Sequence, residues 1–407
     1  MFFSISKTKG DSRFHNHYWI NGFNVSTDDG WSRTETINGT TLFYKGYSDT
    51  NMIENIAEDF EYNTKPRYTG NFCVILVYDN KVVITHDIDR SFPLKYYSND
   101  KISNLPYPNN VKIEDHIWSD SIVEYTNNGI NKIFFENFYN VDVSETISLS
   151  DCKKDIEEIL SKKVNNLNKI SNTINIFLSG GIDTTMVYSL LKKYYTQNIN
   201  IITKEIFEFT EFTTKNMDSL LNHSGTWGYK QFHHWKQNSF YATGGMGDEI
   251  FLRGPTTAAL WCAWHDVNLL KELENINYAY HKKYFLLEKN KKIIDYYWSN
   301  RRNIQEEFSN YSDLCWQICN MVSNDHQHWH LENTISWTPL KDIRIIKNIL
   351  KLPKDIILKQ IIHGIVDLEI ISKLHPEMKK HICTHKNHNQ YDNLLLYPPF
   401  LEKLNNV

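Results

Sequence analysis

The stretch INIFLSGGIDTTMVYSLL, residues 174–191, carries the strongest structural signal in the chain. Its first part, Asn175–Leu178, is an apolar run too short for a globular helix and typical of a buried strand. Gly180 and Gly181 then allow a sharp turn and bring backbone N–H groups close to a bound group. The residues that follow have apolar side chains at the spacing of a helix that packs on a sheet. The sequence therefore predicts a strand, a glycine loop and the start of a helix.

The start of that predicted helix is suited to binding an anion. A helix N-terminus presents backbone N–H donors without intrahelical partners and the positive end of the helix dipole. A strand, a glycine loop and a helix N-terminus in succession bind phosphate. Asp183 would repel a phosphate, so its carboxylate indicates a Mg2+ ion between the two. The alternative is a tight turn in which Asp183 caps the helix. The residues predicted to bind phosphate are Ser179, Gly180, Gly181, Ile182, Asp183 and Thr184.

A second glycine-rich stretch, FYATGGMGDEIFLRGP from Phe240 to Pro255, again runs from a predicted strand through a loop into a helix. Parallel strands bring such loops to one edge of a sheet. Asp248, about 65 positions after Asp183, is therefore expected to share its Mg2+ ion. The alternative is a helix N-terminus whose acids only complement the dipole. Gly244 and Gly245 complete the predicted binding residues.

Both stretches resemble motifs of known enzymes. The string Ser179–Thr184 is similar to the pyrophosphate-binding loop of the ATP-pyrophosphatase superfamily, whose members cut ATP between the α and β phosphates. The string GGMGDEIF, Gly244–Phe251, resembles the Gly-Glu-Gly-Ala-Asp-Glu-Leu-Phe segment of asparagine synthetases. The resemblance implies ATP and Mg2+ as cofactors. It also implies that Asp183 and Asp248 are catalytic metal ligands and that Glu249 is catalytic.

The chain departs from this family at one loop position and matches it weakly elsewhere. Gly245 stands where the family has a Glu that is implicated in handling the incoming amine. The segment Trp337–Lys359 resembles the family's C-terminal segment, with Asp342 near the start of a helix. Lys359 is thereby a candidate for the family's essential lysine, and a solvated surface lysine is the alternative. Arg253, which follows the second acidic loop, is a candidate contact for phosphate or a substrate carboxylate.

The first third of the chain is typical of a β-rich domain. The stretch NFCVILVYDNKVVITHDID, Asn71–Asp89, predicts two strands with a hairpin turn at Asp79-Asn80. The overlapping stretch HDIDRSFPLKYY, His86–Tyr97, resembles a strand pair of the class II glutamine amidotransferase domain that precedes the synthetase domain. The resemblance implies an Ntn-hydrolase-like αββα sandwich.

That glutaminase domain uses an N-terminal cysteine thiolate as its nucleophile. This sequence begins Met1-Phe2-Phe3-Ser4, and the nearest cysteine is Cys73, inside an apolar strand. We therefore expect that glutamine hydrolysis is absent and that the domain is structural or recognises substrate. The β-lactam synthetases and lasso-peptide cyclases are relatives that likewise use an amine other than glutamine-derived ammonia.

The pattern changes at residues 145–151. Helical spacing follows, with Asp151 as the expected N-cap and Ser150 as the alternative. Predicted strands at 174–178, 199–203, 229–235 and 239–243 alternate with helices, which indicates a parallel sheet, and residues 256–380 are mostly helical. We expect an α+β amidotransferase-like domain over residues 1–147. An α/β ATP-pyrophosphatase-like domain with a helical extension is expected over residues 148–407.

Charge and hydropathy indicate which classes of partner are not expected. The formal net charge is -4 and the pI about 6.5, so the chain lacks the basic surface expected of a nucleic-acid-binding protein. No apolar run approaches the roughly 18 residues of a membrane span, and no secretory signal is evident at the start, so a cytoplasmic location is expected. The sequence leaves the oligomeric state open, with a homodimer as one candidate.

Together these features predict an AMP-forming ligase. It would adenylate a small-molecule or peptide carboxylate, release pyrophosphate, and pass the acyl group to an amine or ammonia. One alternative is an ammonia-dependent asparagine synthetase. Another is a non-catalytic nucleotide-binding or scaffold protein.

Overall fold

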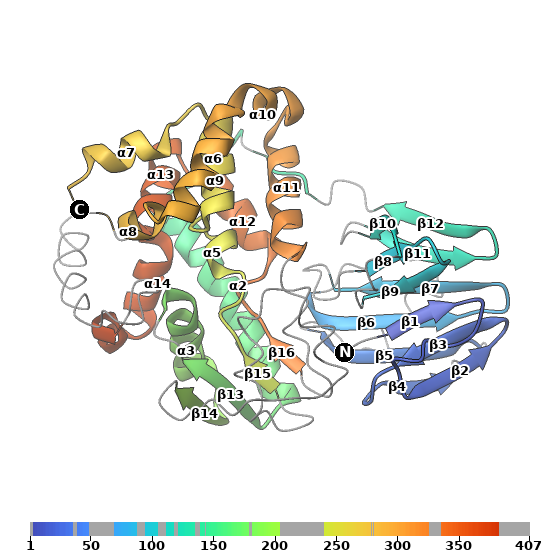
Figure 1. Ribbon diagram of the computed structural model, residues 1–407. Coiled ribbons are helices and arrows are strands. Elements are labelled where there is room, and N and C mark those ends of the chain that lie inside the picture. The colour runs from blue at the N-terminus through green and yellow to red at the C-terminus, as the bar shows by residue number, and fades with distance from the viewer. Residues whose placement is uncertain are drawn as a thin grey trace.

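Three β-sheets and a body of helices form the part of the chain that the structure describes. In Figure 1 two antiparallel sheets lie on one side, most helices lie on the other, and a small parallel sheet lies low between them. The structure is a computed structural model. It describes residues 3–35, 39–48, 69–87, 94–104, 111–117, 121–134, 139–142, 144–178, 181–203, 240–277, 279, 281–324 and 335–381.

The first antiparallel sheet holds the start of the described chain at its interior. Its strands are β1 (Phe3–Ser6), β2 (Asn16–Ile20), β3 (Phe23–Thr27), β8 (Leu94–Tyr97), β9 (Lys101–Ser103) and β10 (Ile113–Ile117). They are ordered β10-β8-β9-β1-β3-β2. Strand β1 therefore pairs on both edges, with Ser4 opposite Ser26 of β3 and opposite Ser103 of β9.

The second antiparallel sheet contains the predicted hairpin. Its strands are β4 (Ser32–Glu35), β5 (Thr41–Ser48), β6 (Gly70–Val77), β7 (Lys81–His86), β11 (Ser121–Thr126) and β12 (Gly129–Phe134). They are ordered β12-β11-β7-β6-β5-β4. Val77 lies opposite Val82, so β6 and β7 flank the Asp79-Asn80 turn and the hairpin prediction is confirmed.

The two antiparallel sheets stack on a shared core. Phe3 and Phe23 of the first sheet and Ile75 and Val123 of the second are almost fully buried in one apolar cluster. The alternation of side chains along each strand explains this packing, because every second residue faces the partner sheet. These two layers match the β layers of the expected αββα sandwich. Before Leu149, the described residues form strands and loops only.

The parallel sheet belongs to the second half of the chain. Its strands are β13 (Thr173–Leu178), β14 (Asn198–Thr203), β15 (Phe240–Ala242) and β16 (Ile335–Trp337), ordered β14-β13-β15-β16. All its pairings are parallel. The strands predicted at 174–178, 199–203 and 239–243 are confirmed, and the strand predicted at 229–235 lies outside the described residues.

Helices account for most of the remaining described chain. They are α2 (Leu149–Ile170), α3 (Ile182–Tyr194), α5 (Gly247–Ile250), α6 (Pro255–Trp264), α7 (Leu269–Asn275), α8 (Lys282–Phe285), α9 (Glu288–Ser299), α10 (Arg301–Glu307), α11 (Tyr311–Asn324), α12 (Ile343–Leu350), α13 (Lys354–His363), α14 (Ile365–Leu374) and the 3-10 helix Pro376–His381. The helix predicted to follow the first glycine loop is α3, which begins at Ile182. Among the described residues, none of these helices combines the length and the apolar character that crossing a bilayer requires.

The expected cap of α2 is wrong by several positions. The N-cap is Ser148, whose hydroxyl oxygen accepts the backbone N–H of Asp151 at 3.1 Å. The Ser148 hydroxyl in turn donates to the Asp151 carboxylate at 2.6 Å. A serine three residues before an acid can accept the backbone N–H of that acid and donate to its carboxylate within one turn. The helix therefore starts earlier than either Asp151 or Ser150.

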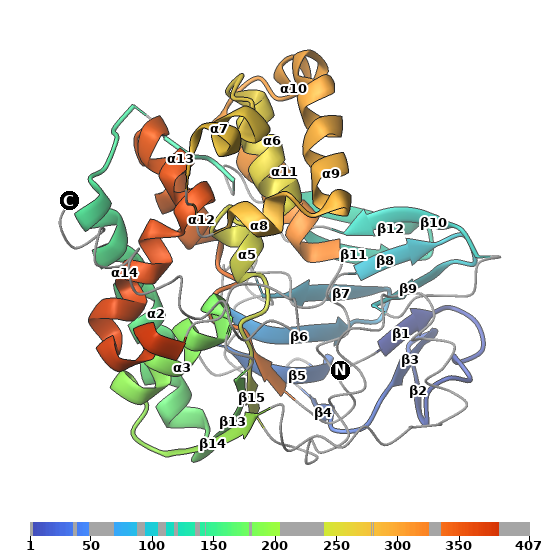
Figure 2. The same ribbon diagram turned by 60° about the vertical axis from the view of Figure 1, so that its left-hand side comes forward.

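The β-rich part packs directly on the parallel sheet. The rings of Tyr47 on β5 and Phe240 on β15 have centroids 5.6 Å apart. The Ser312 hydroxyl oxygen accepts the backbone N–H of Val141, and Lys351 accepts that of Ile147. Figure 2 shows β15 and β16 beside β5 and β6 from a second direction.

Asp342 fixes the segment that follows β16. Its carboxylate accepts the backbone N–H of Arg344 at 2.9 Å and so caps α12. The same fully buried carboxylate lies 3.1 Å from the buried ammonium of Lys163 on α2. Burial acts to raise the pKa of Asp342, but Lys163 and Arg344 outweigh it and lower that pKa to about 2. An ion pair thus joins the segment Trp337–Lys359 to α2.

We expect Asp342→Asn to lower the free energy of unfolding at neutral pH by about 3 to 5 kcal/mol, because the buried ammonium of Lys163 then loses the negative charge of Asp342. Asn still caps the helix. A carboxyl whose pKa is lowered by folding contributes stability above its unfolded pKa near 4, and loses it as pH falls through about 2. The difference between wild type and variant should therefore shrink on acidification. Urea unfolding across that range measures it, and a difference independent of pH would contradict the assignment.

Candidate active site

The two glycine loops lie together at one edge of the parallel sheet. β13 and β15 are neighbours, with Ile174 opposite Phe240 and Ile176 opposite Ala242. Because the strands are parallel, the chain leaves both at the same edge. In Figures 1 and 2, α3 and α5 both lie above this sheet, toward the helical body. The expected meeting of the two loops is therefore observed, while Ser179 and Gly180 lie outside the described residues.

Contact between the loops depends on two glycines. A Cβ atom added to Gly244 would lie 2.6 Å from the Asp183 Cβ and 2.6 Å from the Thr184 backbone nitrogen. A Cβ atom added to Gly247 would lie 2.1 Å from Asp183 Oδ1. Both distances are far below van der Waals contact. The second loop thus lies directly against Asp183, and any side chain at these positions would separate the two loops.

The first loop presents a helix N-terminus. Gly181 is the N-cap of α3, in an extended conformation, and has no side chain to accept the first helical N–H groups. The Thr184 hydroxyl donates to the Gly181 carbonyl at 3.3 Å. Ile182 is buried in the core, so its predicted contribution to binding would come from its backbone alone. The geometry agrees with an anion-binding helix start.

The second loop is conformationally strained. The backbone N–H of Gly245 donates to the Thr243 hydroxyl oxygen at 3.2 Å. Met246 and Leu252 have φ values of 69° and 58°, in the left-handed region that side-chain-bearing residues seldom adopt. Each costs on the order of 1 to 3 kcal/mol and persists only where the surroundings impose it. Such residues concentrate at functional sites, which supports a functional reading of this loop.

Arg253 is bound to the protein's own acids, so the expectation that it contacts phosphate or substrate is wrong. Its side chain is 1% exposed. It forms ion pairs with Asp183, Asp248 and Asp367, the last of these on α14. Burial opposes its charge, but the three carboxylates outweigh it and raise the pKa of Arg253 above its ordinary value. Sequence reasoning missed Asp367 altogether, because it lies far downstream in an unremarked helix.

Negative charge exceeds positive charge around these loops. Burial and the neighbouring Asp248 raise the pKa of Glu249 to about 7. Burial likewise raises the pKa of Asp367 to about 6, although Arg253 acts against it. Three carboxylates pair with the guanidinium of Arg253, and the Glu249 carboxyl lies close enough to interact with its charge. Such an excess is what a bound divalent cation would offset.

The donor set fits a magnesium ion that arrives with a nucleotide. Among the described residues there is no group of three or more His, Cys, Asp or Glu side chains arranged to hold a metal. Asp183 and Asp248 have side chains 17% and 15% exposed, so each reaches the surface of the loops. Mg2+ is commonly held by one or two carboxylates together with phosphate oxygens and water. Two acids at this edge meet that requirement.

The contact that the structure describes for Lys359 is with an acid on its own helix. Lys359 lies on α13 with its side chain 56% exposed, and its ammonium is 3.7 Å from Asp355 one helical turn earlier. This is a solvated pair on the surface of a helix, which contributes little to stability. The placement agrees with the alternative stated for Lys359, that of a surface lysine.

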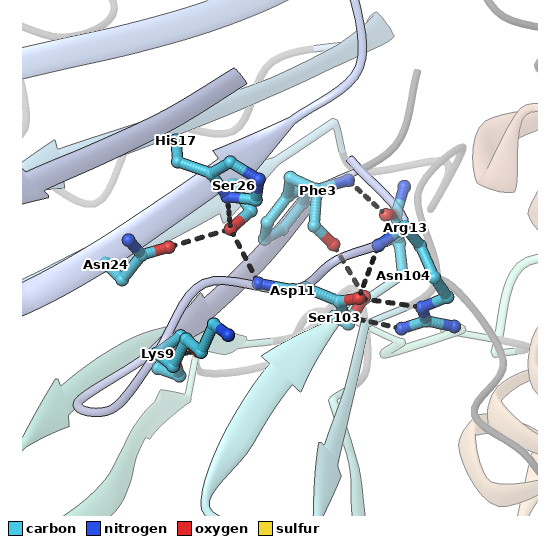
Figure 3. Close-up of polar contacts among 10 residues, drawn as sticks. Phe3, Lys9, Asp11, Arg13, His17, Asn24, Ser26, Ser103 and Asn104 are labelled. Carbon is cyan, nitrogen blue, oxygen red and sulfur yellow. Dashed lines mark hydrogen bonds and ion pairs between the residues drawn. The ribbon is translucent and has the colours of Figure 1, made fainter. Parts of the chain in front are cut away.

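The start of the β-rich part is bound by structural hydrogen bonds. The Phe3 backbone N–H donates to Asn104 Oδ1 at 2.9 Å, and the Ser103 hydroxyl donates to the Phe3 carbonyl at 2.6 Å. The next loop is fixed by Ser26, which accepts the Asp11 backbone N–H at 3.1 Å (Figure 3). Ser4, within β1, is buried. These polar groups secure the first described strand between its two neighbours.

Cys73 is not suited to act as a nucleophile. It lies within β6, is fully buried, and packs in the core between the antiparallel sheets. Burial, with a further effect of Asp87, raises the pKa of the Cys73 thiol well above its ordinary value. The thiolate is the reactive form, so this thiol is inert at neutral pH.

The solved structures compared with this chain are remote from it in sequence. No family model and no curated protein matches the chain. One solved structure, the glutamine phosphoribosylpyrophosphate (PRPP) amidotransferase from B. subtilis complexed with ADP and GMP, is 6% identical with a TM-score of 0.22, and the alignment covers 57% of this chain and 63% of that one. A second, described as the allosteric regulatory enzyme of purine biosynthesis, is 6% identical with a TM-score of 0.19, covering 56% and 59%. The chain thus spans less than two thirds of either protein, and neither likeness assigns it to a family.

Proposed function

We propose that this protein is an ATP-dependent ligase that adenylates a carboxylate and transfers the acyl group to an amine, releasing AMP and pyrophosphate. One observation carries the proposal. Asp183 and Asp248, on loops far apart in sequence, lie beside the same helix N-terminus at one edge of a parallel sheet. The resemblance of both loops to those of asparagine synthetases supports the assignment of ATP as the nucleotide.

The proposed reaction has two displacements. A carboxylate oxygen of the substrate attacks the α-phosphorus of ATP, and the bond to the bridging oxygen breaks as pyrophosphate leaves. The amine nitrogen then attacks the acyl carbon, the bond to AMP breaks, and the amine loses a proton to a base. Displacement at phosphorus depends on positioning and on neutralising charge. Mg2+ would supply that neutralisation when bound with ATP by Asp183 and Asp248.

The chain's own residues contribute positioning. The N-terminus of α3, from Gly181 to Thr184, directs backbone N–H groups toward the place where the pyrophosphate part would lie. Gly244 and Gly247 keep Asp183 against the second loop. Glu249, which the resemblance marks as catalytic, directly follows Asp248 in α5 and is the candidate group for accepting the proton of the amine. No cysteine in the β-rich part is suited to release ammonia from glutamine, so the proposed amine enters as such.

A non-catalytic nucleotide-binding protein is the second candidate. Two observations favour it: Arg253 already forms ion pairs with both acids, and the contact described for Lys359 lies on its own helix. The intact pair of acids beside an anion-binding helix start favours the ligase.

Magnesium-dependent pyrophosphate release separates these functions. The purified protein is incubated with ATP, Mg2+ and a panel of amino acids, peptides and amines, and both pyrophosphate and AMP are quantified. The ligase should release them in equal amounts, only when a carboxylate substrate is present, and stop when Mg2+ is chelated. Release confined to aspartate with ammonia would identify an asparagine synthetase. Nucleotide binding without turnover across the panel would favour the non-catalytic function.

A further inference from the structure

Arg253 connects three helices through three separate nitrogens. Its Nη2 faces Asp183 of α3, its Nη1 faces Asp248 of α5, and its Nε faces Asp367 of α14. A guanidinium is planar and presents its donors in a fixed fork. The two acids predicted to bind metal are therefore held at a separation set by one rigid group, and the Asp367 carboxylate of α14 forms an ion pair with the Nε side of that group.

The arrangement is layered from the interior outward. Arg253 is 1% exposed and Asp367 is fully buried, whereas Asp183 and Asp248 are 17% and 15% exposed. The guanidinium thus binds the two acids from beneath, while part of each remains accessible at the surface of the loops. A nucleotide-bound ion approaching from solvent would meet the acids and not the arginine.

The turn before α14 is shaped to admit this contact. Gly364 has a φ of 64°, and a Cβ atom there would lie 2.9 Å from Asp367 Oδ1 and 3.5 Å from the Arg253 Cδ. A side chain would be strained by the backbone and would press on the carboxylate. The tight turn between α13 and α14 therefore allows Asp367 to lie against Arg253.

We infer that Arg253 is a positioning residue, which sets the spacing of Asp183 and Asp248 for the divalent ion bound with the nucleotide, and that Asp367 holds Arg253 in that role. The inference rests on the proposed function. A lysine in place of Arg253 would keep the positive charge but lose the planar set of donors, since an ammonium is a single point of charge on a flexible stem. Groups that orient metal ligands commonly alter metal affinity by about 10- to 100-fold when replaced.

The test is calorimetric titration of MgCl2 into the full-length protein saturated with an ATP analogue whose α–β bridge is a methylene group. Arg253→Lys should weaken Mg2+ binding by at least about 10-fold while the midpoint of thermal unfolding stays near that of the wild type. Asp367→Asn should act in the same direction without changing the fork itself. Arg301→Lys is the matched control, because Arg301 pairs with Asp266 at 2.9 Å and lies on α10.

The outcomes separate the two ideas. Wild-type Mg2+ affinity in both Arg253→Lys and Asp367→Asn would overturn the positioning role and leave the ligase proposal intact. A lower unfolding midpoint without weaker Mg2+ binding would show a purely structural ion pair and would likewise overturn it. Absence of Mg2+-dependent analogue binding in the wild type would overturn the proposed function and the inference together.

Discussion

Asp183→Asn should reduce ATP-to-pyrophosphate turnover by at least about 100-fold, which is the scale on which preorganised charges act in active sites. The substitution keeps the shape of the side chain and removes the negative charge that would meet the divalent ion. Gly244, Gly247 and Arg253 all lie against Asp183, so its carboxylate is fixed in place at the junction of the two loops. Turnover is measured by pyrophosphate release under saturating substrate.

The fold should survive this change. Arg253 retains the carboxylates of Asp248 and Asp367, so its charge remains paired. We expect a loss of about 1.5 to 3 kcal/mol in the free energy of unfolding, the value of one hydrogen bond to a charged group. Asp266→Asn is the matched control, because that aspartate is exposed and pairs with Arg301 on α10. Turnover that survives Asp183→Asn in a folded protein would refute the metal-binding role.

Gly247→Ala should reduce turnover nearly as much as Asp183→Asn does, because the added methyl group clashes with Asp183. The added Cβ would lie 2.1 Å from Asp183 Oδ1 and 2.4 Å from its Cγ, so the carboxylate or the loop must move. Overpacking of this kind costs about 1 to 3 kcal/mol of stability. A displacement near 1 Å at a reacting centre reduces rates by about 100-fold. The losses of stability and of turnover would both result from one added methyl group, with no change in charge.

Gly254→Ala is the control for that substitution. Gly254 belongs to the same loop, has φ -67° and ψ 140°, and its nearest neighbour to a new Cβ is Thr257 Oγ1 at 3.3 Å. This conformation is open to alanine, so stability should change by less than about 1 kcal/mol and turnover should stay near the wild type. Equal turnover in Gly247→Ala and the wild type would show that Asp183 is not held where the structure places it.

The sequence predicted the local elements of the site well. Apolar runs and helical spacing around the loops are short-range signals, and they correctly placed β13, α3 and β15. The close approach of the two loops at Gly244 and Gly247 was not predicted and came from the structure. The alternation of strands and helices predicted the parallel sheet and, through it, the meeting of the two loops. The N-cap of α2 was misplaced because Ser148, Ser150 and Asp151 are all good caps, and only the backbone geometry chooses among them.

The sequence by itself determined the strand–loop–helix units, the parallel sheet and the two acids that end at its edge, because each follows from periodicity and turn chemistry within a few residues. Only the tertiary structure decided the partners of those acids. Arg253 faces inward to Asp183, Asp248 and Asp367, and Lys359 stays beside Asp355 on its own helix. The physical reason is that a buried charge must find an opposite charge wherever the fold supplies one. The partner of each buried charge depends on how helices distant in sequence pack together, and local sequence patterns do not predict that packing.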